Sequence, residues 1–211
     1  MFKHLIWDVD GTLFNTYPAF TLAFSLAMIE LQAPVPLDKI DRLAKVSLGH
    51  CAKILASDYG LSPEELEASF DRHYSLIPVE NQGPFPGVRQ ACELVKNRGG
   101  LNLIVTHRRP ESTQRLLEVH AMSGLFEEVV SAQQGYPDKP DPAMFDYLIE
   151  KYGLVPGETL GVGDREIDVQ AGAAAGCKTA LFGSNHCPTH PDFHFTEFGE
   201  LVALLQASVN V

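Results

Sequence analysis

Five short apolar runs rich in branched side chains recur along the chain, and each predicts a β-strand. They lie at Lys3–Trp7, Leu101–Val105, Glu128–Ser131, Leu160–Gly163 and Lys178–Phe182. Stretches with helical periodicity follow, at Val88–Asn97, Pro110–Met122 and Pro142–Tyr152, the last with Asp141 as its cap. Hydrophobic strands that alternate with helices are typical of a parallel sheet covered by helices on both faces. We therefore expect an α/β, Rossmann-like fold with its ligand site beyond the carboxyl ends of the strands.

One long segment breaks this alternation. Between residues 15 and 82, apolar residues recur at spacings of three and four, and no strand is predicted. The chain then passes through Gly83-Pro84-Phe85-Pro86-Gly87, a stiff linker of the kind that separates two units. We expect a sheet domain of residues 1–14 and 83–211, and a small all-helical domain of residues 15–82 inserted after the first strand.

Composition and charge narrow the possible partners. The chain has 211 residues, of which 45% are apolar and 20% charged, as is common in folded globular proteins. Its 16 basic and 27 acidic residues give a net charge of −11, which argues against nucleic acid or an anionic membrane as a partner. The amino terminus lacks the pattern of a signal peptide, and no apolar run is long enough to span a membrane. We expect a cytoplasmic protein.

The four cysteines do not predict a disulfide framework. Cys51, Cys92, Cys177 and Cys187 show no CxxC spacing, and the first three lie in apolar settings typical of buried thiols.

Two aspartates mark the end of the first predicted strand, where Asp8-Val9-Asp10-Gly11-Thr12 follows the apolar run. Residues two apart in an extended chain point the same way, so both carboxylates can face one small site. Because two close carboxylates repel each other, a divalent cation is expected between them. Oxygen ligands of this kind favour Mg²⁺, which commonly binds one or two carboxylates together with a substrate phosphate.

Three further signals fall at strand ends later in the chain. Thr106 follows the second predicted strand directly, where its hydroxyl could hold a phosphate oxygen. Lys139 lies just ahead of a helix start and could offset negative charge near a nucleophilic carboxylate. Asp164 ends the fourth strand, and Asp168 follows four residues later, a spacing that we expect to place both acids on one helix face.

Taken in this order, the motifs resemble those of the haloacid dehalogenase-like hydrolase superfamily, in particular its phosphoglycolate-phosphatase-like branch with a helical cap. The resemblance covers nearly the whole chain. It implies that Asp8 is a nucleophile that forms an aspartyl-phosphate and that Asp10 is the general acid and base. It also implies a metal site for Mg²⁺ and a phosphate site. The metal site would comprise Asp8, Asp10 through its backbone carbonyl, Asp164 and Asp168; the phosphate site would comprise Thr106, His107, Lys139 and Gly11.

The chain departs from that family pattern after Thr106. The branch commonly has asparagine at the next position, where this chain has His107, followed by Arg108 and Arg109. We expect the backbone amide of His107 to serve phosphate still; whether the three side chains contact substrate stays open. Within the helical domain, the segment Val46–His50 resembles the specificity loop of the family, and it makes His50 and Lys53 candidates for substrate contacts.

The chain near its carboxyl end contains three histidines and a cysteine, at His186, Cys187, His190 and His194. Their spacing matches no common zinc pattern, so we favour a structural or solvated role.

These patterns favour a Mg²⁺-dependent phosphatase that acts on a small phosphorylated metabolite, as a monomer or a homodimer. Two alternatives stay open: a phosphomutase on the same scaffold, and a catalytically idle module that binds a phosphometabolite. Dehalogenase activity is disfavoured because the resemblance to that branch fails at Asp10. Phosphonate cleavage would need a Schiff-base lysine in the cap, for which Lys53 is a weak candidate. Sequence alone does not name the substrate.

Overall fold

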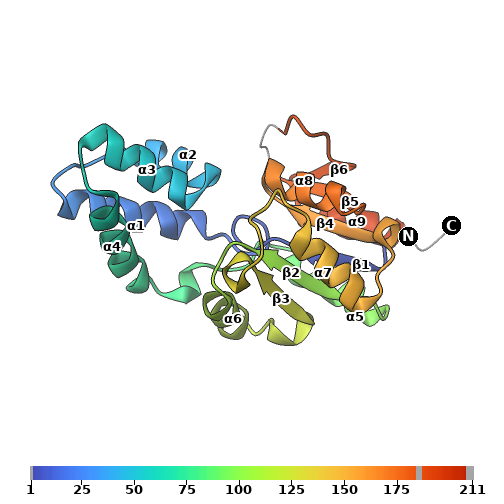
Figure 1. Ribbon diagram of the computed structural model, residues 1–211. Helices are drawn as coiled ribbons and strands as arrows, with labels where there is room; N and C mark the ends of the chain where they lie inside the picture. The colour runs from blue at the N-terminus through green and yellow to red at the C-terminus, as the bar shows by residue number, and fades with distance from the viewer. Residues whose placement is uncertain (1, 184–186, 208–211) are drawn as a thin grey trace. The chain divides into compact units, whose positions relative to one another are not determined.

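The computed structural model describes residues 2–183 and 187–207. The chain forms two compact units (Figure 1). One, here called the sheet unit, comprises Met1–Phe14 and Pro84–Val211, and the other, the helical unit, comprises Asn15–Gly83. Gly83, expected in the sheet domain, falls in the helical unit, where its carbonyl accepts a hydrogen bond of 2.9 Å from the amide of Asn15.

A parallel sheet of six strands, in the order β3-β2-β1-β4-β5-β6, forms the centre of the sheet unit (Figure 1). The strands are β1 (His4–Trp7), β2 (Asn102–Thr106), β3 (Glu128–Ser131), β4 (Thr159–Gly163), β5 (Lys178–Phe182) and β6 (Phe193–Phe195). β1 lies between β2 and β4 and is buried throughout, as are both neighbours. The expected α/β fold is confirmed, and its strand ends bring the segments after β1, β2 and β4 to one edge of the sheet.

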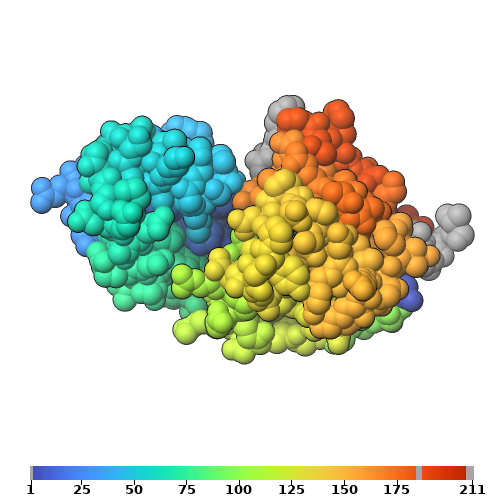
Figure 2. Space-filling model, viewed as in Figure 1, coloured from blue at the N-terminus to red at the C-terminus, as the bar shows by residue number. Residues whose placement is uncertain are grey.

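Helices cover both faces of this sheet. Ile6 of β1 packs in a core cluster with Met144 and Phe145 of α7 (Ala143–Tyr152). The next residue, Trp7, points to the opposite face, where its ring lies 6.2 Å from that of Phe198 in α9 (Phe198–Ala207). α5 (Val88–Asn97) packs beside α9, while α8 (Glu166–Ala174) packs on β4 and β5, and α6 (Pro110–Val119) packs on β3. In the space-filling view, side chains around α7 hide the strands on that face (Figure 2).

Two helix boundaries differ from expectation. α6 ends at Val119 rather than Met122, because the chain leaves the helix at His120 and Ala121 takes a positive φ of 51°. α7 begins at Ala143, with Pro142 in the cap position. The carboxylate of Asp141 still accepts a hydrogen bond of 2.9 Å from the Ala143 amide. The residue expected to cap the helix therefore satisfies the amide of its first residue.

The helical unit consists of α1 (Tyr17–Glu30), α2 (Leu37–Val46), α3 (Leu48–Tyr59) and α4 (Pro63–Ser75). α1 packs against α2 and α4, and the enclosed core is apolar and rich in aromatic rings, including Phe20, Phe24 and Phe70. Within the described residues, no helix combines the length and apolar character that crossing a bilayer requires.

Candidate active site

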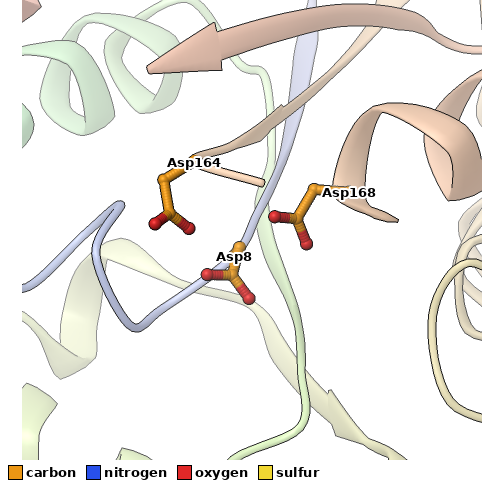
Figure 3. A group of neighbouring side chains, drawn as sticks. All are labelled: Asp8, Asp164 and Asp168. Carbon is orange, nitrogen blue, oxygen red and sulfur yellow. The ribbon is translucent and has the colours of Figure 1, made fainter. Parts of the chain in front are cut away.

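Three buried carboxylates converge at the carboxyl edge of the sheet (Figure 3). Asp8 follows β1, Asp164 follows β4, and Asp168 lies in the first turn of α8. Each offers an oxygen that lies within 4.8 Å of the oxygens offered by the other two. Because β1 and β4 are hydrogen-bonded neighbours, residues 156 positions apart in sequence share one small volume.

Gly163 allows this close approach between β4 and α8. A Cβ atom at Gly163 would lie 2.2 Å from Cβ of Asp168, far inside the distance at which carbon atoms touch. Asp164, however, precedes the helix, which starts at Glu166. The expectation that Asp164 and Asp168 share one helix face is therefore wrong: the strand end and the helix deliver them separately.

Lys139 lies between two of these carboxylates. Its ammonium donates to Asp8 Oδ1 at 2.6 Å, to Asp168 Oδ1 at 2.6 Å and to the Val105 carbonyl at 3.2 Å. An ammonium has three hydrogens, so all of its donors are engaged. The lysine side chain is 1% exposed and that of Asp8 3%, which makes this a fully desolvated ion pair. The position of the ammonium is therefore tightly defined.

Burial and neighbouring charge shift the pKa values of this network. Burial, with Asp168 adding like charge, raises the pKa of Asp8 to about 6. Burial acts in the same direction on Asp168, but Lys139 and Arg165 outweigh it and lower the pKa of that carboxyl. Burial alone would lower the pKa of Lys139; the two carboxylates raise it. The three carboxylates together carry one more negative charge than Lys139 and Arg165 balance. A bound cation would offset this excess.

Thr12 is a member of the site that sequence reasoning missed. Its buried hydroxyl lies 3.5 Å from Asp8 Oδ2 and 3.4 Å from Asp164 Oδ1. The hydroxyl has one hydrogen and can serve one of these oxygens at a time. The only sequence signal was its place in the Asp8–Thr12 segment.

Asp10 stands apart from the carboxylate cluster. Its Oδ1 accepts a hydrogen bond of 2.7 Å from the Arg108 guanidinium, whose side chain is only 7% exposed against 21% for Asp10. Arg108 is held in turn by Ser112, whose hydroxyl accepts from its Nε at 2.9 Å. The carboxylate of Asp10 is therefore paired with the buried Arg108 guanidinium. Any contact between Asp10 and a metal would come from its backbone.

The residues expected to bind phosphate differ in whether their hydrogen-bond donors are already engaged within the protein. Thr106 is buried, and its Oγ1 accepts the backbone amide of Arg108 at 3.0 Å, which leaves its O–H able to donate. The ring of His107 accepts from the Lys139 amide. The amide of Gly11 donates to the Phe14 carbonyl at 2.9 Å, so the turn uses the donor that Gly11 was expected to offer to phosphate.

The candidate specificity residues lie on one helix of the helical unit. α2 ends at Val46 and α3 begins at Leu48, so the expected break is the single residue Ser47, whose hydroxyl accepts from the His50 amide at 3.0 Å. His50 is half-buried and Lys53, three residues on along α3, is exposed.

Of the residues considered for zinc, His186 lies outside the described residues. Cys187 donates its thiol to the Thr189 carbonyl, and a ring nitrogen of His194 meets the Gly183 carbonyl. The group of potential ligands that the described part of the chain brings together is the Asp8, Asp164 and Asp168 cluster.

This cluster fits a hard divalent cation. All of its donors are carboxylate oxygens, the ligands that Mg²⁺ prefers. Both oxygens of Asp168 already accept hydrogen bonds, Oδ1 from the Lys139 ammonium and Oδ2 from the Arg165 amide at 3.1 Å. Asp8 Oδ2 and Asp164 Oδ1 both face the Thr12 hydroxyl, at 3.5 and 3.4 Å.

Comparison with known proteins gives the family. Residues 5–182 match the haloacid dehalogenase-like hydrolases, a span that includes Asp8, Thr106, Lys139 and the two later aspartates. The chain belongs to this family. The resemblance seen in the motifs is therefore confirmed for this haloacid dehalogenase-like hydrolase.

Relatives match the hydrolase over almost its full length. A phosphoglycolate phosphatase from Mannheimia succiniciproducens is 30% identical over 220 residues, which cover 97% of this chain and 98% of that protein. The crystal structure of a predicted phosphoglycolate phosphatase from Haemophilus somnus is 26% identical, with a TM-score of 0.81 and coverage of 96% and 97%. A structure from Thermotoga maritima, 21% identical with a TM-score of 0.83 and coverage of 99% and 100%, shares the fold.

Proposed function

We propose that this hydrolase is a Mg²⁺-dependent phosphatase that cleaves the phosphate ester of a small metabolite through an aspartyl-phosphate on Asp8. The observation that carries the proposal is the buried Lys139 ammonium shared by Asp8 and Asp168, with Asp164 beside them. A buried lysine of this kind holds a carboxylate in place and supplies positive charge where a phosphoryl group would arrive. The phosphoglycolate phosphatases among the relatives support the same reaction class.

The two chemical steps divide between Asp8 and Asp10. A carboxylate oxygen of Asp8 attacks phosphorus, the bond from phosphorus to the ester oxygen breaks, and Asp10 gives its proton to the leaving alcohol. Asp10 then takes a proton from water, whose oxygen attacks phosphorus and releases phosphate from Asp8. Asp10 must be free to reach the ester oxygen, so we expect Arg108 to hold it before substrate binds and to release it during turnover.

Asp8, Asp164 and the backbone carbonyl of Asp10 would hold the magnesium ion. When bound, the ion offsets the negative charge of the phosphoryl group. We assign Asp168 to Lys139, because both of its oxygens already have partners. Thr106, through its hydroxyl, and His107, through its amide, would bind phosphoryl oxygens together with Lys139.

We assign residues 15–83 to substrate selection, as a cap domain, with His50 and Lys53 of α3 as candidates for contact with the part of the substrate distant from phosphorus. Their individual replacement by alanine should change relative kcat/KM values among natural phosphate esters. Hydrolysis of a small artificial ester should change much less.

The direct test is hydrolysis of p-nitrophenyl phosphate with Mg²⁺ and then with excess EDTA. We expect turnover that the chelator abolishes and that fresh Mg²⁺ restores. A panel of phosphorylated short acids, sugars and nucleotides, with phosphoglycolate among them, would then identify the preferred ester. Tight binding of a phosphometabolite without any turnover would contradict the proposal and favour an idle binding module.

A further inference from the structure

The loop that carries Lys139 has few backbone donors of its own. Three of the six residues from 137 to 142 are prolines, which have no amide hydrogen. Among the remaining amides, that of Asp141 closes a turn on the Asp138 carbonyl at 3.0 Å. The Lys139 amide instead bonds outside the loop. It donates to Nε2 of His107 at 2.9 Å, across 32 residues of sequence.

His107 is well suited to accept this bond. It stands directly after Thr106, at the carboxyl end of β2, and its side chain is 30% exposed. Burial, with the nearby Lys139 and Arg165 charges, lowers the pKa of His107 to about 4. The ring is therefore neutral near pH 7, and a neutral imidazole that accepts at Nε2 carries its proton on Nδ1.

The side chain and backbone of Lys139 are thus fixed at two different places. The ammonium is held by the Asp8 and Asp168 carboxylates and by the Val105 carbonyl of β2. The amide is held by His107 at the adjoining turn. A movement of the loop backbone would draw the ammonium away from Asp8, because the bond of 2.6 Å has little tolerance for displacement.

We propose that His107 is a positioning residue for Lys139: its imidazole accepts the Lys139 amide and thereby keeps the lysine ammonium on Asp8 and Asp168. The proposal rests on the proposed phosphatase function, in which Lys139 offsets charge on the transferring phosphoryl group. It gives the His107 side chain a role beyond the phosphate contact assigned to its backbone amide. The same ring also joins the turn after β2 to the loop before α7, two segments that would both contact phosphate.

Replacing His107 by glutamine, asparagine and alanine tests this role. The glutamine carbonyl oxygen reaches about as far from the backbone as Nε2 does, whereas the asparagine oxygen reaches only as far as Nδ1. H107Q should therefore keep kcat within about 3-fold of wild type, while H107N and H107A should lose about 10- to 100-fold, with KM changed by less than about 3-fold. His194 on β6, exposed and with a ring nitrogen that likewise contacts the backbone, here the Gly183 carbonyl, provides the control. H194N should leave kcat unchanged.

Equal losses in H107Q and H107N would overturn the proposal, since they would show that the loss comes from removing the ring and not from losing an acceptor. So would full activity in H107A. Urea unfolding of each variant checks the alternative of a damaged fold: the kcat differences must exceed what any change in the folded fraction explains.

Nitrogen NMR of the imidazole in wild-type enzyme tests the hydrogen bond without any need for activity. At pH 7, His107 should be neutral with its proton on Nδ1, and the Lys139 amide signal should move in H107A but stay near its wild-type position in H107Q. A ring protonated on Nε2 would overturn the proposal. If wild-type protein hydrolyses no phosphate ester while this NMR signature is present, the proposed function fails and the His107–Lys139 contact stands.

Discussion

The two units of this hydrolase differ in whether they bury charged side chains. The helical unit, described throughout, buries no charged side chain, and its ion pairs lie on its surface. In its Lys45–Asp41 pair, for example, the side chains are 45% and 37% exposed. The sheet unit buries Lys139 with Asp8 and Asp168 almost completely. Buried ion pairs contribute little net stability because desolvation offsets their attraction, so this network is better explained by chemistry than by folding.

The comparison implies that changes in the buried network should affect activity first, whereas matched changes in the helical unit should affect neither activity nor stability strongly. The largest effect is expected at Asp8. Asp8→Asn removes the attacking oxygen's charge with little change in shape, so kcat should fall at least about 1,000-fold. The free energy of unfolding should stay within about 1 kcal/mol of wild type. Steady-state kinetics and urea unfolding provide the two measurements; near-normal kcat would end the proposed mechanism.

Lys139→Met should have the second-largest effect on activity. Methionine fills a similar space but leaves two buried carboxylates without their partner, so kcat should fall about 100- to 1,000-fold. In metal-free buffer the free energy of unfolding should drop by about 3 kcal/mol. The matched change in the helical unit, Lys45→Met, should alter it by less than about 0.5 kcal/mol. Similar losses in both variants would break the contrast between the units.

Gly163→Ala tests the same contrast with a substitution at a glycine, where an added methyl group would contact the buried network. The added methyl would meet Asp168, so α8 must shift, at a cost of about 1–3 kcal/mol in unfolding free energy. A displacement of about 1 Å there should lower kcat roughly 100-fold. Gly49 of α3 has nothing within 4 Å of its own Cβ position, so Gly49→Ala should keep or slightly raise stability. Thermal unfolding of both variants would show whether contact with Asp168 matters.

The smallest expected effect is the pH dependence of magnesium binding. Burial raises the pKa of Asp8 to about 6, so its carboxyl is mostly ionised at pH 7 and mostly protonated at pH 5. Because the ion needs the carboxylate, affinity should fall about tenfold as the pH drops from 7 to 5. Isothermal titration of metal-free protein at several pH values measures this. In Asp8→Asn most of the dependence should disappear; if it persists unchanged, another group titrates.

Local patterning was enough to predict most of the sheet unit. Two predicted strands, at Glu128–Ser131 and Lys178–Phe182, have the observed bounds, and the others are within one residue. A strand buried on both faces leaves a continuous apolar run, which sequence shows directly. Since the carboxyl ends of parallel strands meet at one edge, the same runs also predicted that Asp8 and Asp164 would lie together. The prediction that failed also concerned a few neighbouring residues: Asp164 was assigned to a helix, but α8 begins only at Glu166.

The amino-acid sequence by itself thus determined the fold class and the acids at the strand ends, because both follow from periodicity within a few residues. Only the tertiary structure decided which side chains hold those acids and their lysine. Arg108 meets Asp10 across 98 residues, Thr12 meets Asp164 across 152, and His107 meets the Lys139 amide across 32. Such contacts depend on where turns from different strands come to rest after packing, and no local periodicity encodes that position.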